Sequence, residues 1–235
     1  MVTPPAVMNH FRSMNGVMPA TEAVRVKPRA EFRVFGHGLI KAVQERMWMA
    51  GAVLHMARQM PEEVYLLSRH TDVANVKVRE GLLDVKLRTG DTAEGYEIYQ
   101  PWGKFRFPLA SADLKETLGH LRVEMALGGE SCAYDKFLML ARAHPDLTVV
   151  SVEKIRYGFS VQGVICEYAK VMFNGALMET ACCESDDHAA LTRAIAVLGL
   201  AAMPNTSYTR AAMRVVGMIA YGPPLYAPPA LEARA

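Results

Sequence analysis

Four pairs of basic residues in this sequence share one spacing, a lysine and an arginine separated by a single apolar residue. In a β-strand, residues i and i+2 lie on the same face, so each pair predicts a strand with one apolar and one cationic face. Lysine supplies a point charge and arginine a two-pronged donor, and both suit phosphate oxygens. The pairs are Lys77/Arg79, Lys86/Arg88, Lys104/Arg106 and Lys154/Arg156, and the residues between them are Val78, Leu87, Phe105 and Ile155.

Two interpretations of these cationic faces remain open. An antiparallel sheet normally turns polar residues to water, which would make the pairs ordinary solvated positions. Like charges on adjacent strands destabilise pairing, however, and Lys77/Arg79 and Lys86/Arg88 fall on neighbouring strands of a predicted hairpin. Such crowding costs free energy unless an anion or interleaved carboxylates compensate it. We favour a polyanion site, which would lie in the lumen if the sheet closes into a barrel.

The nearly neutral overall charge limits the kinds of ligand that the protein is expected to bind. The chain has 235 residues, with 26 Lys or Arg against 24 Asp or Glu, and a formal net charge of +2. This balance argues against nonspecific attraction to nucleic acid or membrane. There is no apolar run of about 18 residues, and the first residues lack the pattern of a signal peptide. We therefore expect a cytoplasmic protein whose partner is a phosphate-rich small molecule or polyphosphate, with homodimerisation left open.

The periodicity of the apolar residues predicts the elements that must hold these side chains. The order of strands, helices, strands and helices indicates an α+β protein around a large antiparallel sheet. Strands are predicted at 30–36, 64–68, 75–80, 82–88, 147–161, 164–174 and 176–185, with 95–100 and 103–109 as two strands or one bent strand. Helices are predicted from Leu39 to about Gln59 and at 114–125, 134–144, 188–200 and 205–220.

Proline-containing segments mark both ends of the predicted domain. Residues 1–28 are expected to form a flexible leader and residues 216–235 a tail, which leaves 29–215 as one folded domain. The four cysteines form no C-x-x-C pair and have no histidine at zinc-ligand spacing, which argues against a zinc site.

The order of several segments resembles the CYTH group, also called triphosphate tunnel metalloenzymes. The resemblance spans about residues 30–212 and implies an eight-stranded antiparallel β tunnel with flanking helices. It also implies triphosphate binding, with hydrolysis or cyclisation of a triphosphate substrate. It assigns phosphate binding most clearly to Lys77, Arg79, Lys86, Arg88, Lys154 and Arg156, and adds Arg33; Lys104 and Arg106 follow from the spacing. The segments include EFRVFG (31–36), VKVREGLLDVKLR (76–88), KFRF (104–107), VEKIRYGF (152–159) and NGALMETACCESDD (174–187).

The first strand departs from the family pattern. Typical members begin with Glu-x-Glu-x-Lys, whose glutamates help to hold Mg²⁺ or Mn²⁺, whereas this chain has Glu31, Arg33 and Phe35. Such ions need several oxygen ligands, and an arginine repels them. Glu31, Glu167 and Glu184 are the remaining candidate metal ligands, and Glu31 and Glu184 the candidate catalytic groups. Each of these glutamates is alternatively a salt-bridge partner of the basic pairs.

These observations leave three functional hypotheses. The first is a Mg²⁺- or Mn²⁺-dependent triphosphatase, in which the basic pairs hold phosphates while metal ions neutralise developing charge. The second is a catalytically inactive relative that binds a phosphate or nucleotide ligand, or serves as a scaffold. The third, ranked lower, is a nucleic-acid-binding basic sheet.

Overall fold

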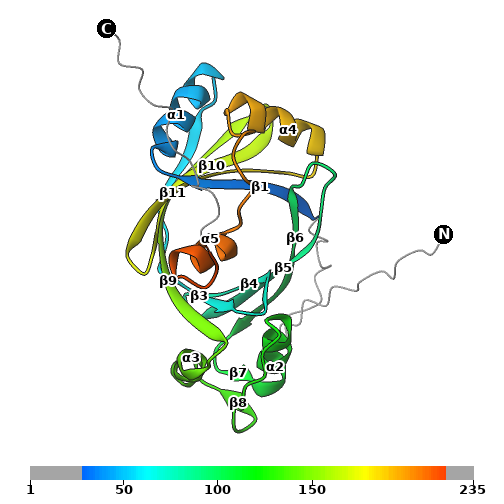
Figure 1. Ribbon diagram of the computed structural model, residues 1–235, viewed down its shortest axis with the longest axis vertical. Coiled ribbons are helices and arrows are strands. Elements are labelled where there is room, and N and C mark those ends of the chain that lie inside the picture. Colours follow the sequence, from blue (N-terminus) through cyan, green and yellow to red (C-terminus); the bar gives the residue numbers. More distant parts are fainter. Residues whose placement is uncertain (1–27, 221–235) are drawn as a thin grey trace, which may run out of the picture.

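The computed structural model describes residues 28–220, in which a ring of strands surrounds a short helix (Figure 1). The strands follow the order β10-β11-β1-β6-β5-β4-β3-β9, and the pairing of β9 with β10 closes the ring. Every pairing is antiparallel. The predicted eight-stranded antiparallel barrel with flanking helices is therefore confirmed. Its strands are β1 (Arg29–Gly36), β3 (Glu63–Ser68), β4 (Thr71–Arg79), β5 (Leu82–Asp91), β6 (Glu97–Arg106), β9 (Leu147–Val161), β10 (Val164–Phe173) and β11 (Ala176–Ser185).

Tight turns set the register of the strands that carry the basic pairs. Glu80 and Gly81, both with positive φ, join Arg79 to its partner Leu82 in the β4–β5 hairpin. A two-residue turn of this kind matches the twist of the flanking strands. The same arrangement recurs at 162–163 and 174–175, the turns that join β9 to β10 and β10 to β11.

The region from Leu39 to Gln59 corrects one prediction. The helix α1 covers only Leu39–Met49, and Gly51, with φ 66°, follows its end. The strand β2 (Leu54–Gln59) then pairs with β9. Because β9 is 15 residues long and β3 pairs only with its first part, the rest of that β9 edge is open to β2. Local helical spacing cannot reveal this distant partner.

The two predicted strand segments at 95–100 and 103–109 correspond mainly to one bent strand, β6, which covers Glu97–Arg106. Its register with β5 moves from the Val85–Gly103 pair to the Lys86–Pro101 pair, so Trp102 is an extra residue in a β-bulge. A bulge bends its strand and increases the local twist. The short strands β7 (Leu109–Ala110) and β8 (Ser131–Cys132) pair separately and lie outside the barrel.

The helices surround and fill the barrel. Asp187 accepts a hydrogen bond from the Ala190 backbone N–H and caps the start of α4. None of the helices within residues 28–220 is long and apolar enough to cross a membrane. The helices after α1 are α2 (Ser111–His120), α3 (Tyr134–Ala143), α4 (His188–Val197) and α5 (Tyr208–Val215). The predicted leader falls outside the described residues except for residue 28, and so does the predicted tail from residue 221.

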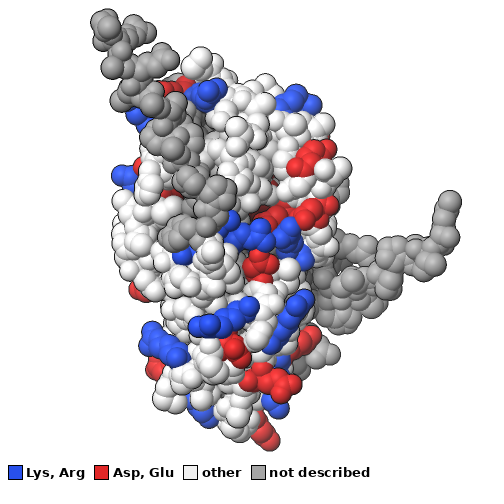
Figure 2. All heavy atoms as spheres, in the orientation of Figure 1, with Lys and Arg blue, Asp and Glu red and all other residues white. Residues whose placement is uncertain are grey.

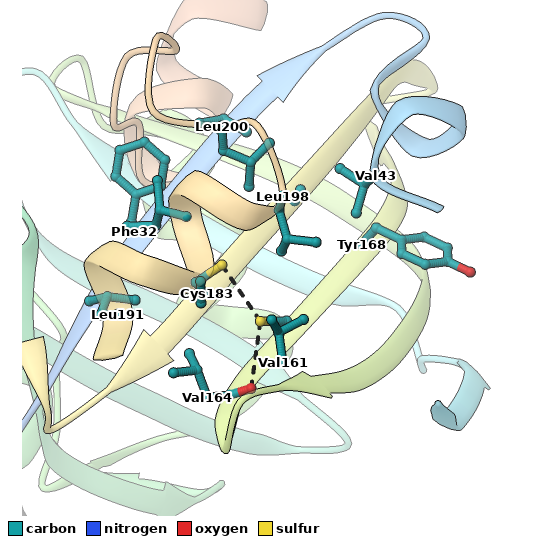
Figure 3. Packing of buried hydrophobic residues seen from close by; sticks show 14 of the residues in the cluster. Phe32, Val43, Val161, Val164, Tyr168, Cys183, Leu191, Leu198 and Leu200 are labelled. Carbon is teal, nitrogen blue, oxygen red and sulfur yellow. Dashed lines mark hydrogen bonds between the residues drawn. The ribbon is translucent and has the colours of Figure 1, made fainter. Parts of the chain in front are cut away.

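The apolar core has three parts, which follow from alternation along the strands. On β1, Phe32 and Val34 face outward into a cluster with α1 and α4 (Figure 3), whereas Phe35 faces a cluster around α5. The third cluster packs β4 and β5 against α2 and α3. In Figure 1, α5 lies within the ring of strands. The barrel interior is therefore partly filled by the chain itself.

The chain reaches α5 along the open edge of β1. Strand β1 pairs with β6 only from Arg29 to Glu31. Beyond that point, the Thr206 backbone N–H donates to the Arg33 carbonyl at 2.7 Å, and the Arg33 N–H donates to Asn205 Oδ1 at 2.9 Å. These bonds satisfy backbone groups of β1 that β6 leaves unpaired. They place Tyr208 at the start of α5 beside the lumen.

Candidate functional site

A cavity of about 160 Å³ lies in the barrel lumen beside α5, and every barrel strand contributes to its lining. The structure brings nine of the twelve predicted site residues together here. Their proposed roles in phosphate, metal or catalytic chemistry stay predictions. The nine are Glu31, Arg33, Lys77, Arg79, Lys86, Lys154, Arg156, Glu167 and Glu184.

Three predicted phosphate-binding residues lie away from this lining. Arg88 donates to Asp91 at 2.9 Å and pairs with Glu97 at 3.2 Å. The side chain of Lys104 is 54% exposed, and its nearest carboxylate is Asp84 at 3.9 Å. Arg106 is exposed at the last residue of β6. Equal spacing therefore did not give equal position: Lys104 and Arg106 lie at the exposed end of β6, and Arg88 is paired with Asp91 and Glu97.

Glu63, which the sequence pattern did not single out, joins three of the cations. Its side chain is 1% exposed and accepts from Lys77 Nζ at 3.0 Å, from Arg79 Nη1 at 3.1 Å and from Lys154 Nζ. Burial opposes ionisation, but Lys154 and Lys77 lower the pKa of Glu63 to about 2. A sequence signal existed, because Glu63 begins the strand before the hairpin and shares the face of Tyr65. The sequence did not show which strands would place their cations opposite Glu63.

Lys154 is a buried member of the same lining, with a side chain that is 6% exposed. Its Nζ donates to Tyr65 Oη at 2.9 Å and lies 4.2 Å from the centre of the Tyr208 ring. The ring faces attract the ammonium group. Burial nevertheless lowers the pKa of Lys154 to about 7, against the opposing effect of Glu63. Lys154 can therefore change charge near neutral pH.

A second ion-pair network joins β1, β9 and β10. Arg33 Nε donates to Glu31 Oε1 at 2.8 Å, and Arg33 Nη1 donates to Glu167 Oε1 at 3.0 Å. Arg156 Nε donates to the other oxygen of Glu167 at 2.8 Å. Burial raises the pKa of Glu167, but the two guanidinium groups outweigh it and the pKa is lowered. Glu167 is thus an ionised salt-bridge partner, one of the two roles considered for it.

The prediction of a strongly cationic face needs correction. The lining contains six Lys or Arg side chains and four glutamates, so the cations exceed the carboxylates by two. Interleaved carboxylates, and not an anion alone, compensate most of the crowding. Within residues 28–220, Lys86 has no carboxylate partner. Figure 2 likewise shows basic and acidic side chains mixed on the drawn face.

The three candidate metal ligands do not form a suitable donor set. Glu31 and Glu167 hydrogen bond to Arg33, and Glu184 pairs with Arg29 at 3.2 Å. No group of three His, Cys, Asp or Glu residues within 28–220 is arranged to hold a metal ion. A divalent ion at this position would have to displace a buried guanidinium. We therefore derive no chemical step through Mg²⁺ or Mn²⁺.

The adjacent residues Cys182 and Cys183 point to opposite sides of β11, as alternation along a strand requires. Cys182 lines the cavity, whereas Cys183 lies in the outer core, where its Sγ is 3.6 Å from Cys166 Sγ (Figure 3). All four cysteines are buried and unbridged. Burial raises the pKa of the Cys182 thiol, which makes it a poor nucleophile at neutral pH.

No protein-family model matches the sequence, and no curated protein matches it. A solved protein from Hippeastrum, described as an adenylyl cyclase candidate with a dominant triphosphatase activity, is 10% identical with a TM-score of 0.45; the match covers 83% of this chain and 98% of that one. A conserved hypothetical protein from Pyrococcus furiosus is 14% identical with a TM-score of 0.42, over 73% and 91% of the two chains. An adenylate cyclase candidate from Bacillus halodurans is 9% identical with a TM-score of 0.41, over 77% and 94%.

These similarities concern overall architecture at most. At such identities and TM-scores they assign no ligand or activity to this chain. The barrel itself is established by the strand pairings described above. Membership of the CYTH group stays a prediction.

Proposed function

We propose that the barrel lumen binds a phosphate-bearing anion, with a triphosphate or polyphosphate chain as the favoured ligand, and does not hydrolyse it. The observation that carries this proposal is the excess of cations over carboxylates in a lumen cavity that is partly open to solvent, where Lys86 is exposed. Lys86 lines the cavity with no carboxylate partner among the described residues, and Arg79 and Arg156 are partly exposed there. Charged donors of this kind form strong hydrogen bonds to phosphate oxygens.

The size of the cavity limits which part of a ligand can enter. About 160 Å³ is well below the roughly 300–1,000 Å³ of pockets that enclose drug-sized molecules. Phosphate groups fit such a space better than a whole nucleotide does. A nucleoside or a longer polyphosphate would therefore remain at the opening, and a nucleic-acid duplex would not enter.

The carboxylates favour binding over hydrolysis. Metal-assisted phosphoryl transfer needs an ion to neutralise developing charge and a group to position water. Glu31 and Glu167 are engaged by Arg33, and Glu63 by three cations. None of these three glutamates is left as a free base, so the inactive-relative hypothesis fits the geometry best.

Binding and turnover can be measured on the same samples. Purified protein is mixed with inorganic triphosphate, ATP or long-chain polyphosphate, in EDTA or in Mg²⁺ or Mn²⁺, and followed by calorimetry, thermal shift and phosphate release. We expect binding and thermal stabilisation in EDTA, with no release above the protein-free rate. Metal-dependent release would instead establish the triphosphatase. Absence of binding under every condition would refute the proposal.

Lys86 and Lys104 offer a matched pair of variants. One charge-assisted hydrogen bond contributes about 1.5–3 kcal/mol, so Lys86→Glu should raise the Kd for inorganic triphosphate at least about tenfold. Lys104→Glu makes the same charge change away from the cavity lining and should change the Kd less than about threefold, as expected for a screened surface charge. Equal effects of the two variants would mean that net charge, and not the cavity, binds the anion.

The cytoplasmic location and a homodimer are separate expectations that these measurements do not address.

A further inference from the structure

We propose that the guanidinium group of Arg33 is a built-in cation of the site, lying between two carboxylates where a divalent ion would otherwise be bound. Anion binding in this barrel would then require no metal, and Arg33 would itself contact the ligand. The ligand part of this inference rests on the proposed function. The exclusion of metal does not, and it is tested separately below.

The contacts of Arg33 are those of a bridging cation. Its Nε donates to Glu31 at 2.8 Å and its Nη1 to Glu167 at 3.0 Å, so one delocalised charge joins carboxylates from β1 and β10. The side chain is only 6% exposed. Its guanidinium carbon lies 4.3 Å from the centre of the Tyr208 ring, which holds the planar group from the side of α5.

The strand register explains how one side chain reaches both carboxylates. Glu31 is two residues before Arg33 and shares its strand face. Across the sheet, Arg33 is in register with Cys182 on β11, and Cys182 is in register with Glu167 on β10. Neighbouring strands are about 4.8 Å apart, so Glu167 begins roughly 10 Å away from Arg33. The long arginine crosses the small side chain of Cys182 to reach it.

Arg33 also keeps donors for a ligand. A guanidinium has five N–H donors, and within the described residues Nε and Nη1 bond to Glu31, Glu167 and, at 3.4 Å, Thr180 Oγ1. Nη2 makes no hydrogen bond to residues 28–220, and it is not among the fully enclosed unsatisfied atoms. Because Arg33 lines the cavity, Nη2 is placed to donate to an anionic oxygen that enters it.

The same arrangement excludes a divalent ion. An added ion would face a fixed positive charge that already uses one oxygen of each carboxylate. The second oxygen of Glu167 is used by Arg156. The ion would have to break these contacts in a buried place, where replacing them is costly. Neutralising Arg33 removes this obstacle and leaves Glu31, Glu167 and Glu184 on the lumen side of adjacent strands.

The decisive experiment compares the wild type with Arg33→Gln and Arg29→Gln. The second variant is the control, because it also removes a guanidinium from a glutamate, Glu184, but on an exposed side chain. Mn²⁺ binding is measured without phosphate by electron paramagnetic resonance of free Mn²⁺ and by thermal shift. Inorganic triphosphate binding is then measured by calorimetry in EDTA and in Mn²⁺.

We expect neither the wild type nor Arg29→Gln to bind Mn²⁺ at 1 mM, and both to bind triphosphate in EDTA. Arg33→Gln should melt at a lower temperature, regain stability with Mn²⁺, and bind triphosphate at least about tenfold more weakly in EDTA than in Mn²⁺. Mn²⁺ binding by the wild type, or a strict need for metal in its triphosphate binding, would overturn the inference. The wild-type measurements decide this even where Arg33→Gln fails to fold. Absence of triphosphate binding in every condition would refute the proposed function, while the Mn²⁺ result would still stand.

Discussion

Replacing Glu63 by glutamine gives the sharpest test of the electrostatics of the lumen. The substitution keeps the shape of the side chain but removes the charge that holds Lys77, Arg79 and Lys154 together. The neighbouring cations lower the pKa of Glu63 from 4.5 to about 2, which corresponds to about 3 kcal/mol. Breaking a buried ion pair typically costs about 3–5 kcal/mol, which is the same magnitude.

We therefore expect Glu63→Gln to lower the free energy of unfolding by about 3–4 kcal/mol at pH 7. For a domain of this size the melting temperature should fall by roughly 6–16 °C. Urea titrations followed by circular dichroism measure the difference. The control is Glu62→Gln, because Glu62 is adjacent but exposed and accepts a hydrogen bond from Ser151 Oγ. Its effect should stay within about 0.5 kcal/mol.

The pH dependence separates charge from packing. The pKa of Glu63 is lower in the folded than in the unfolded protein. The ionised carboxylate therefore contributes to the free energy of unfolding above pH 4.5, and this contribution is lost as the pH falls through about 2. The difference in unfolding free energy between wild type and Glu63→Gln should shrink from about 3 kcal/mol at pH 7 to about 1 kcal/mol at pH 3 by this linkage. A difference that is below about 1 kcal/mol at pH 7, or that does not change with pH, would refute the reasoning.

Two further predictions concern groups whose pKa is shifted by burial. Because the pKa of Lys154 is lowered to about 7, its positive charge is lost above neutrality, so triphosphate binding should weaken from pH 6 to pH 8.5 in calorimetry, and less so in Lys154→Arg. Between about pH 7 and 10.5 the unfolded chain binds a proton at Lys154 that the folded chain lacks, so this residue should make the free energy of unfolding rise with pH. Triphosphate binding that does not change with pH would contradict the lowered pKa of Lys154. All four cysteines are buried, and the pKa values of Cys182 and Cys183 are raised, so Ellman's reagent should modify no thiol in the native protein and four in urea. Rapid reaction of a native thiol would show that the barrel opens far more readily than its packing implies.

Parts of the site followed from local pattern alone. Alternation with period two and the Glu80-Gly81 turn predict the β4–β5 hairpin, and hence that Lys77 and Arg79 share a face. Strand parity likewise separates Cys182 from Cys183. These features depend on residues close in sequence, whose geometry is set by backbone sterics and side-chain periodicity. The closed eight-stranded barrel was predicted from the family resemblance and not from local pattern. Local pattern predicts the hairpin of β9 and β10, but it does not predict that β3 pairs with the other edge of β9.

Other parts depended on partners that periodicity cannot identify. Glu63 compensates the predicted cationic face, and Arg88 uses its charge outside the cavity, because of register and bulges. The helical pattern after Met49 gave way to β2 because β9 offered an open edge. A short segment of sequence does not show which distant strand or side chain will be its partner.

The sequence by itself determined which side chains lie together on each strand face, because alternation is a local property of the extended chain. It also placed Arg33 two residues after Glu31, on the same face of the first strand. Only the tertiary structure decided what that arginine does. Closure of the barrel brings Glu167 across Cys182 to meet it and places Tyr208 of α5 against its guanidinium. The carboxylates that neutralise the basic residues come from strands far apart in the sequence. Whether the lumen is strongly cationic or nearly neutral therefore depends on the tertiary structure.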